Sequence, residues 1–347
     1  MSDIDIRKQG RAGRITLTRP KALNALTYEM CLAIDAALKD WATDDDIALL
    51  VIDAEGERAF CAGGDIAKMY ETGLAGDFAY GRKFWADEYR MNARLAEFPK
   101  PVVTLLQGFT MGGGVGVGCH GSHRIVCESS QIAMPECGIG LVPDVGGSLI
   151  LANAPGRLGE YLGTTGMRMG PADAIYAGFA DYFVPQADWP ALIDALCTTG
   201  DWEAVDRAAS PAPEGSLQDM QAQVDRHFAG QTLGDILRSL RHEESDFTHG
   251  ALKALGHPAP LSMACTVEMM HRLRGDKTIR QALDLEYRFT YRAMEHGDFI
   301  EGIRAQIIDK DKSPKWRLGL EDTIAAEVPR MLMPLGAERL QFEEETS

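Results

Sequence analysis

Hydrophobic and polar positions alternate at the start of the chain and then change to a helical spacing. Alternation on both sides of a glycine-containing turn predicts two short paired strands within residues 3–18. Thr27 can cap a helix whose apolar positions recur every three or four residues as far as Trp41. The apolar run over residues 47–54 is typical of a buried parallel strand. The opening of the chain is therefore predicted to be β-β-α-β.

Two further strands run into glycine-rich loops. The segment 59–66 ends a strand with Gly63-Gly64, and Asp65 could cap a helix after it. The apolar strand 102–106 leads to the triplet 112–114, again with a helix expected next. Two such loops that meet in space would aim two backbone N–H groups at one oxygen, which is the geometry of an oxyanion hole.

Two acidic residues stand in apolar surroundings after the second loop. Glu136 and Asp144 each follow a proline and have apolar or glycine neighbours instead of other charges. Burying a carboxylate is costly unless pairing or chemistry compensates, so we interpret both as site residues. Other roles remain open: Glu136 as a helix-terminal charge or ion pair, and Asp144 as the cap of a helix beginning near Val145. Glu88, on a long helix predicted over residues 77–98, fits a substrate contact or a salt bridge equally well.

The remainder of the chain is mainly helical in pattern. Residues 185–230 are less periodic, and residues 210–215 resemble a linker. We expect a core over residues 1–190, a linker and irregular helical segment over 191–230, and a helical C-terminal region over 231–340 that packs on the core. Helices are predicted at 148–154, 157–165, 171–178, 233–240, 247–255, 261–273 and 279–294, with a short strand at 181–184. The tail that ends in Glu343-Glu344-Glu345 is expected to be disordered.

Composition excludes several classes of protein. The net charge of −16 disfavours nucleic-acid binding, and no apolar run approaches the roughly 20 residues of a membrane span. The N-terminus has neither a secretory nor an organelle-targeting pattern, so a cytoplasmic location is expected. Seven cysteines without a Cys-x-x-Cys pair indicate free thiols and argue against a metal site. His120 and His123 lack acidic partners at ligand spacing, and Cys119 and Cys137 lack a basic partner, so all four are interpreted as structural.

With these motifs identified, the chain resembles the crotonase, or enoyl-CoA hydratase/isomerase, superfamily. Within it, the chain is similar to the 3-hydroxyisobutyryl-CoA hydrolase family over nearly its whole length. The motifs that carry the resemblance are Arg19-Pro-Lys-Ala-Leu-Asn-Ala-Leu26, Cys61-Ala-Gly-Gly-Asp65, Thr110-Met-Gly-Gly-Gly-Val-Gly116, Ala133-Met-Pro-Glu136, Pro143-Asp-Val-Gly-Gly147, Asp298-Phe-Ile-Glu-Gly-Ile-Arg-Ala305 and Ile308-Asp-Lys-Asp-Lys-Ser-Pro-Lys-Trp316. The resemblance implies an α/β fold, a crotonase-like ββα superhelix core with a helical C-terminal region.

The resemblance also implies roles for individual residues. The amides of Gly64 and Gly113 match the oxyanion-hole positions, and Gly113 would contact the substrate as well. Glu136 matches a carboxylate shared by hydratases and hydrolases, Asp144 an acidic position of the hydrolase, and Glu88 a further substrate-site glutamate. Coenzyme A would lie along two backbone segments, with Lys310 or Lys312 near its phosphates. The residues of these two segments are Lys21, Ala22 and Leu23 in one and Ala62 and Gly63 in the other.

The implied activity is hydrolysis of the thioester of a short branched 3-hydroxyacyl-CoA, most plausibly 3-hydroxyisobutyryl-CoA in valine breakdown. Glu136 would act as general base or as covalent nucleophile, and these two routes stay open. No metal or redox cofactor is required, because coenzyme A belongs to the substrate. An enoyl-CoA hydratase or isomerase is the alternative, disfavoured because Gly116 stands where hydratases carry a second glutamate. A non-catalytic acyl-CoA-binding protein is a second alternative. Whether the chain forms a homo-oligomer is left open.

Overall fold

The computed structural model of the protein describes residues 3–342, which form two compact units. The expected disorder at Glu343–Glu345 lies outside the described residues. The chain passes between the units several times, so each unit combines segments that are distant in the sequence. The first unit comprises Met1–Asp65, Arg90–Ala133 and Arg168–Gln218, and the second comprises Ile66–Tyr89, Met134–Met167 and Asp219–Ser347.

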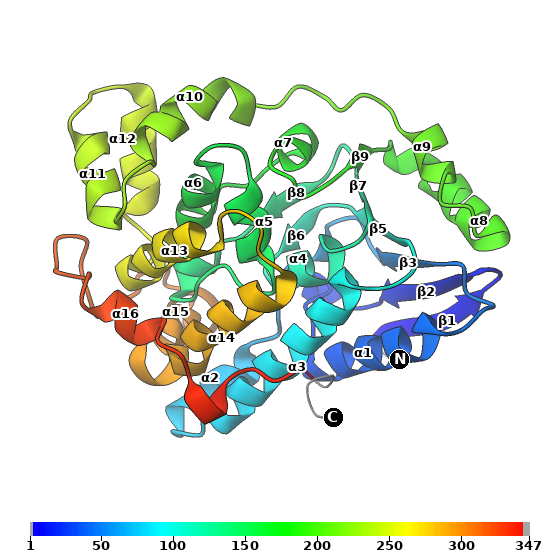
Figure 1. Ribbon diagram of the computed structural model, residues 1–347, viewed down its shortest axis with the longest axis horizontal. Helices are drawn as coiled ribbons and strands as arrows, with labels where there is room; N and C mark the ends of the chain where they lie inside the picture. Colours follow the sequence, from blue (N-terminus) through cyan, green and yellow to red (C-terminus); the bar gives the residue numbers. More distant parts are fainter. Residues whose placement is uncertain (1–2, 343–347) are drawn as a thin grey trace. The chain divides into compact units, whose positions relative to one another are not determined.

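The first unit contains a six-stranded sheet in the order β1-β2-β3-β5-β7-β9 (Figure 1). Its first pair is antiparallel and the remaining neighbours are parallel. The strands are β1 (Ile4–Gln9), β2 (Ala12–Leu17), β3 (Leu49–Ala54), β5 (Val102–Leu106), β7 (His123–Val126) and β9 (Tyr182–Phe183). Thr27 caps helix α1 (Tyr28–Ala42) by accepting a hydrogen bond from the Met30 amide at 3.2 Å. The β-β-α-β opening is therefore confirmed.

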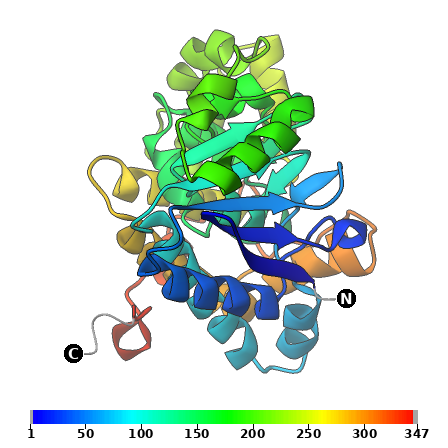
Figure 2. The same ribbon diagram turned by 90° about the vertical axis from the view of Figure 1, so that its right-hand side faces the viewer.

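Helices cover both faces of this sheet. Figures 1 and 2 show α1 in blue and α8 (Trp189–Thr199) in green on opposite sides of it. A Cβ added to Gly13 in β2 would lie 2.5 Å from the ring of Trp41, so this glycine lets α1 approach the sheet closely. On the other face, Leu192 and Leu196 of α8 join the apolar core formed by the strands.

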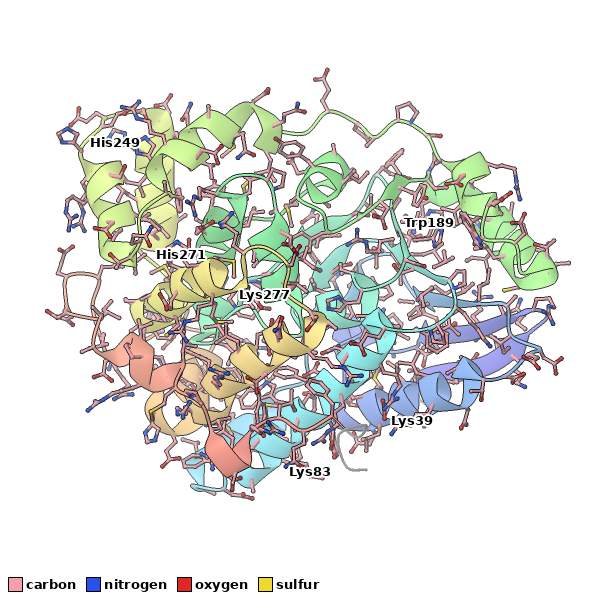
Figure 3. The ribbon with its side chains drawn as sticks, in the orientation of Figure 1. Lys39, Lys83, Trp189, His249, His271 and Lys277 are labelled. Atoms are coloured by element: carbon pink, nitrogen blue, oxygen red, sulfur yellow. The ribbon has the colours of Figure 1, made fainter. Side chains whose placement is uncertain are left out.

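Helix α8 lies in the less periodic part of the sequence. Its indole anchor Trp189 (Figure 3) donates from Nε1 to the carbonyl of Val184 at 3.0 Å, which fixes the helix start against the end of the sheet. The segment also contains α9 (Ala204–Ala208) and α10 (Leu217–His227). These helices are short and are stabilised by packing on neighbouring elements, so their hydrophobic pattern alone does not predict them.

A second, three-stranded parallel sheet in the first unit carries the glycine-rich loops. It consists of β4 (Ala59–Cys61), β6 (Phe109–Met111) and β8 (Gln131–Ala133). Helix α4 (Gly113–Gly118) follows β6 directly, as the sequence predicts, and α7 (Pro171–Tyr176) precedes β9.

The described part of the second unit is helical, and most of its long helices were expected from periodicity; α10, which lies mainly in this unit, was not. Capping boxes at Thr232, Ser245 and Thr278 start three of them. The helices are α2 (Ala67–Leu74), the first part of α3 (Ala79–Ala96), α5 (Gly147–Asn153), α6 (Leu158–Thr165), α11 (Leu233–Arg241), α12 (Asp246–Leu255), α13 (Pro260–Leu273), α14 (Ile279–His296), α15 (Phe299–Ile303) and α16 (Glu327–Met331).

One capping prediction is wrong. Helix α2 begins at Ala67 without a side-chain cap, and Asp65 instead forms an ion pair with Arg19, with Nη2 and Oδ2 3.2 Å apart. The ion pair with Arg19 engages the carboxylate that the local sequence predicted to cap the helix.

Within residues 3–342, no helix is long and apolar enough to cross a membrane.

Candidate active site

The first glycine loop is joined by backbone hydrogen bonds to the loop after β2. The Ala62 amide donates to Leu23 at 3.0 Å, and the Leu26 amide donates to Gly63 at 2.9 Å. Leu23 has a positive φ of 52°, and Lys21 and Ala22 before it are exposed. The two segments expected to hold coenzyme A are therefore brought side by side within the first unit. Their contact with coenzyme A stays a prediction.

The second glycine loop packs against the end of the first. A Cβ added to Gly114 would lie 2.1 Å from the carbonyl oxygen of Cys61, so only glycine permits this approach. Gly112 turns the chain with a φ of 51° before α4 begins at Gly113. Within residues 3–342, neither the Gly64 amide nor the Gly113 amide donates a hydrogen bond to another protein group. Each loop therefore keeps one backbone donor for a ligand.

The second unit brings together the three carboxyls that the sequence singled out. Glu88 on α3, Glu136 at the start of a 3-10 turn (Glu136–Ile139) and Asp144 before α5 are each 4% exposed. Across residues 3–342, none of the three forms an ion pair. Glu88 Oε1 and Glu136 Oε2 also lack any hydrogen-bond partner there. A solvated role for Glu88 does not fit this burial, and a salt-bridged role does not fit the lack of an ion pair within residues 3–342.

Burial without cations raises the pKa values of all three carboxyls. Burial, followed by the charges of Asp144 and Glu286, raises the pKa of Glu88 and of Glu136 well above the ordinary value. Burial raises the pKa of Asp144 to about 7, opposed by a hydrogen bond from Tyr89. Like charges in one buried place oppose each other's ionisation, which adds to the effect of burial. A carboxylate with such a pKa is a stronger base than a solvated one, which suits proton transfer near pH 7.

Two residues at this site escaped the sequence analysis. The Tyr89 hydroxyl donates to Asp144 Oδ2 at 2.7 Å. Glu286 of α14 is fully buried and accepts hydrogen bonds from the Gly146 amide at 2.9 Å and from Ser148. Asp144 does not cap α5, whose N-terminal residues bond to Glu286 instead. The sequence signal that could have identified both residues is a polar group on the apolar face of a helix.

The other chemically notable residues have structural surroundings. His123 stacks on Tyr182, with ring centroids 6.0 Å apart. Burial raises the pKa of both the Cys119 and the Cys137 thiol to about 12, so neither provides a thiolate at neutral pH. All seven cysteines are free and buried, as expected. In the described range no group of His, Cys, Asp or Glu side chains could hold a metal ion.

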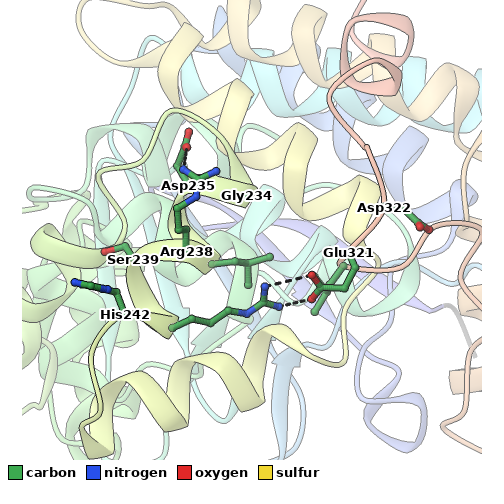
Figure 4. Close-up of a pocket in the computed structure, with 10 residues that line it drawn as sticks. Gly234, Asp235, Arg238, Ser239, His242, Glu321 and Asp322 are labelled. Atoms are coloured by element: carbon green, nitrogen blue, oxygen red, sulfur yellow. Dashed lines mark hydrogen bonds and ion pairs between the residues drawn. The ribbon is translucent and has the colours of Figure 1, made fainter.

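A surface hollow elsewhere in the second unit contains none of the predicted site residues (Figure 4). It lies between α11 and residues 320–322, with a volume of about 740 Å³. Both of its arginines are paired with carboxylates: Arg241 contacts Glu321, and Arg238 Nη1 lies 2.8 Å from Asp235 Oδ1. Such mutual pairing is typical of surface packing and leaves little charge for a ligand.

Comparisons with known proteins agree on the family and differ on the reaction. The chicken and human proteins named "3-hydroxyisobutyryl-CoA hydrolase, mitochondrial" are 36% and 34% identical to this chain, each over 98% of it and 91% of the relative. A crystal structure of an enoyl-CoA hydratase from Rhodobacter sphaeroides is 59% identical, with a TM-score of 0.94 over 98% of this chain and 100% of the other. A carnitinyl-CoA dehydratase structure from Mycobacterium thermoresistibile is 36% identical, with a TM-score of 0.93 over 99% of each chain.

These likenesses confirm the predicted crotonase-like α/β fold with its helical C-terminal region. The family model described as enoyl-CoA hydratase/isomerase matches residues 12–332, which is most of the chain. The chain is therefore an enzyme that belongs to the enoyl-CoA hydratase/isomerase, or crotonase, family.

Proposed function

We propose that this enzyme hydrolyses the thioester bond of a short branched 3-hydroxyacyl-CoA, with 3-hydroxyisobutyryl-CoA as its substrate in valine breakdown. The observation that carries the proposal is the buried carboxyl pair Glu136 and Asp144, which has no cation partner among residues 3–342 and has raised pKa values. The names of the chicken and human relatives support the choice of substrate.

In the proposed reaction, a water oxygen adds to the thioester carbonyl carbon while Glu136 takes the proton. The carbonyl oxygen becomes an oxyanion and accepts hydrogen bonds from the amides of Gly64 and Gly113, each such donor contributing about 3 kcal/mol to the transition state. The C–S bond then breaks, and the thiolate of coenzyme A leaves with the proton held by Glu136. Asp144 would orient the water or the 3-hydroxyl group of the substrate.

A covalent route uses the same residues. Here a Glu136 carboxylate oxygen attacks the carbonyl carbon, the C–S bond breaks, and an acyl anhydride forms on Glu136. Water then hydrolyses the anhydride and regenerates the carboxylate. The unpartnered Oε2 of Glu136 fits either route, since both need an oxygen that is not already engaged.

The alternative proposal is hydration or isomerisation of an enoyl-CoA, favoured by the name of the 59% identical Rhodobacter sphaeroides structure. Addition of water across a C=C bond normally uses two acid–base groups. Position 116 is a buried glycine, whose carbonyl accepts a hydrogen bond from Asn92 at 3.1 Å, so it offers no side chain for that purpose. A non-catalytic acyl-CoA-binding protein would gain nothing from two desolvated carboxyls.

The test compares two reactions of the same preparation. Thiol release from 3-hydroxyisobutyryl-CoA is followed with a thiol reagent, and loss of enoyl absorbance is followed with crotonyl-CoA; enzyme without substrate corrects for its own cysteines. We expect thiol release without enoyl loss. Enoyl loss without thiol release would establish the hydratase alternative, and acyl-CoA binding without either reaction would contradict the proposed hydrolysis.

The cellular location and the oligomeric state stay predictions. The names of the relatives above describe mitochondrial proteins, whereas a cytoplasmic location is proposed for this chain. Fractionation of the native host and light scattering of the purified enzyme test these two points separately from its activity.

A further inference from the structure

Glu286 is a fully buried carboxyl for which the proposed reaction has no use. It lies on α14, more than a hundred residues after the segment it contacts, and forms no ion pair within residues 3–342. Oε2 accepts from the Gly146 amide at 2.9 Å, while Oε1 accepts from the Ser148 amide at 3.3 Å and from the Ser148 hydroxyl. Three donors thus converge on one carboxyl, all from the residues that follow Asp144.

The turn that Glu286 holds is strained. Val145 has a φ of 53° and Gly146 a φ of 79°, so two successive residues are left-handed. This conformation is easy for glycine but unfavourable for a β-branched residue. Val145 is only 1% exposed. A strained backbone persists only where its surroundings determine it, and the bonds from Gly146 and Ser148 to Glu286 provide that constraint.

The same helix also reaches the other side of Asp144. Thr290 lies one turn after Glu286 on α14, and its Oγ1 is 3.5 Å from the Tyr89 hydroxyl that donates to Asp144. Helix α14 therefore contacts both the backbone that carries Asp144 and the donor that fixes its carboxylate. A small shift of this helix or turn would move the carboxylate relative to its donor.

We propose that Glu286 is a positioning residue: it holds the left-handed turn at Val145 and Gly146 and thereby sets the place of the Asp144 carboxylate. The proposal rests on the proposed function in one respect, namely that Asp144 takes part in hydrolysis. Glu286 itself touches neither substrate nor reacting atoms in this scheme. Its effect is transmitted through the backbone of residues 144–148.

The test replaces Glu286 by glutamine, which keeps the shape but turns one acceptor into a donor facing a backbone N–H group. Displacement of a catalytic group by about 1 Å can cost on the order of 100-fold in rate. We expect Glu286→Gln to lower kcat for thiol release by roughly 10- to 100-fold with little change in KM. Glu295→Gln is the control, since this exposed glutamate of the same helix pairs with Arg82 away from the turn. A kcat within twofold of wild type for Glu286→Gln would overturn the proposal.

A second substitution separates positioning from general destabilisation. Val145→Gly removes the Cβ that makes the positive φ costly, so the turn no longer depends as strongly on Glu286. In a double-mutant cycle, Glu286→Gln should therefore cost less kcat in the Val145→Gly background than in wild type. Equal losses in the two backgrounds would contradict the proposed route through the turn.

Hydrogen exchange keeps the inference testable without any substrate. Amides 146 and 148 should exchange faster in Glu286→Gln than in wild type or Glu295→Gln, and unchanged exchange would overturn the proposal. If Glu286→Gln fails to fold, Ser148→Ala removes one of the three donors and should give a smaller change in the same direction. A wild-type enzyme that releases no thiol would refute the proposed function, whereas the exchange experiment would still decide the role of Glu286.

Discussion

Buried carboxyls of two groups in the second unit lose hydration on folding and compensate for that cost differently. The first group is Glu160, and the second is Glu136 with Asp144 and Glu286. Glu160 on α6 is fully buried, and its Oε1 lies 2.7 Å from Arg274 Nη2 and 3.0 Å from Arg157 Nη1. Glu136 is almost as buried but has no cation partner within residues 3–342, and both carboxyls leave Oε2 without a hydrogen bond there. The first carboxyl is paired with two arginines. The second is left able to gain or lose a proton.

The neighbours of the second group explain how it remains adjustable. Asp144 accepts a hydrogen bond from the neutral Tyr89 hydroxyl. Glu286 accepts hydrogen bonds from backbone amides and from the Ser148 hydroxyl. These donors favour ionisation less strongly than an arginine would, so burial keeps the pKa of Asp144 at about 7 and that of Glu286 at about 8. A group that exchanges protons with substrate needs such a balance, while a structural ion pair does not.

The largest expected effect comes from removing an acid of the second group. Glu136→Gln and Asp144→Asn should each lower kcat for thiol release by about 10²- to 10⁴-fold. In Glu136→Gln the amide neither takes up the proton nor acts as a nucleophile, and in Asp144→Asn one acceptor oxygen of the orienting carboxyl is lost. Acyl-CoA binding, measured by calorimetry, should persist in both. Full activity in either variant would refute the role given to that residue. Unchanged far-UV circular dichroism serves as the check on folding.

The reverse result is expected for the first group. Glu160→Gln removes the charge between Arg157 and Arg274, whose side chains are 29% and 34% exposed and can regain water. The free energy of unfolding should fall by roughly 1–3 kcal/mol, with kcat within a few-fold of wild type. Denaturant titration measures the stability, and Glu203→Gln at an exposed ion pair is the control. A loss of activity as large as that of Glu136→Gln would erase the distinction between the two groups.

The sequence predicts those parts of the site that depend on local pattern. Gly64 and Gly113 follow strands and precede helices, and Glu136 and Asp144 stand out as acids among apolar neighbours. Each of these features can be read within a dozen residues. Their roles in catalysis stay predictions.

The contacts that support the site depend on distant segments and could not be predicted. Periodicity shows that Glu286 lies on the apolar side of α14, but not that it reaches Ser148, 138 residues earlier in the chain. The same limit explains the wrong cap at Asp65, where Arg19 is the partner. It also explains why α8 was not predicted, because its short apolar face is recognisable only from its packing on the sheet.

The unpaired carboxyls should also make stability depend on pH. Folding raises the pKa of Asp144 from 3.8 to about 7 and that of Glu286 from 4.5 to about 8. Between these limits the folded state binds more protons than the unfolded state, so this contribution to the free energy of unfolding falls as pH rises from about 4 to about 8. Asp144→Asn removes one titrating group and should flatten the slope by up to about 1.4 kcal/mol per pH unit. The measurement is urea unfolding at several pH values, and an unchanged slope would contradict it; Asp284→Asn, at a partly exposed ion pair, is the control.

The smallest expected effect comes from removing the Tyr89 hydroxyl, which is the neutral donor to Asp144. The Tyr89 hydroxyl lowers the pKa of Asp144, so Tyr89→Phe should raise that pKa further and move the acid limb of the pH–rate profile toward higher pH by up to about one unit. At pH 7 the rate should fall only a few-fold, with most of it recovered at pH 8.5. Tyr287→Phe is the matched control, because its hydroxyl donates to the carbonyl of Arg82 at 3.2 Å. A shift toward lower pH, or an equal shift in Tyr287→Phe, would mean that Asp144 does not set this limb. Its pKa would then be unrelated to turnover, and the contrast with Glu160 would concern stability alone.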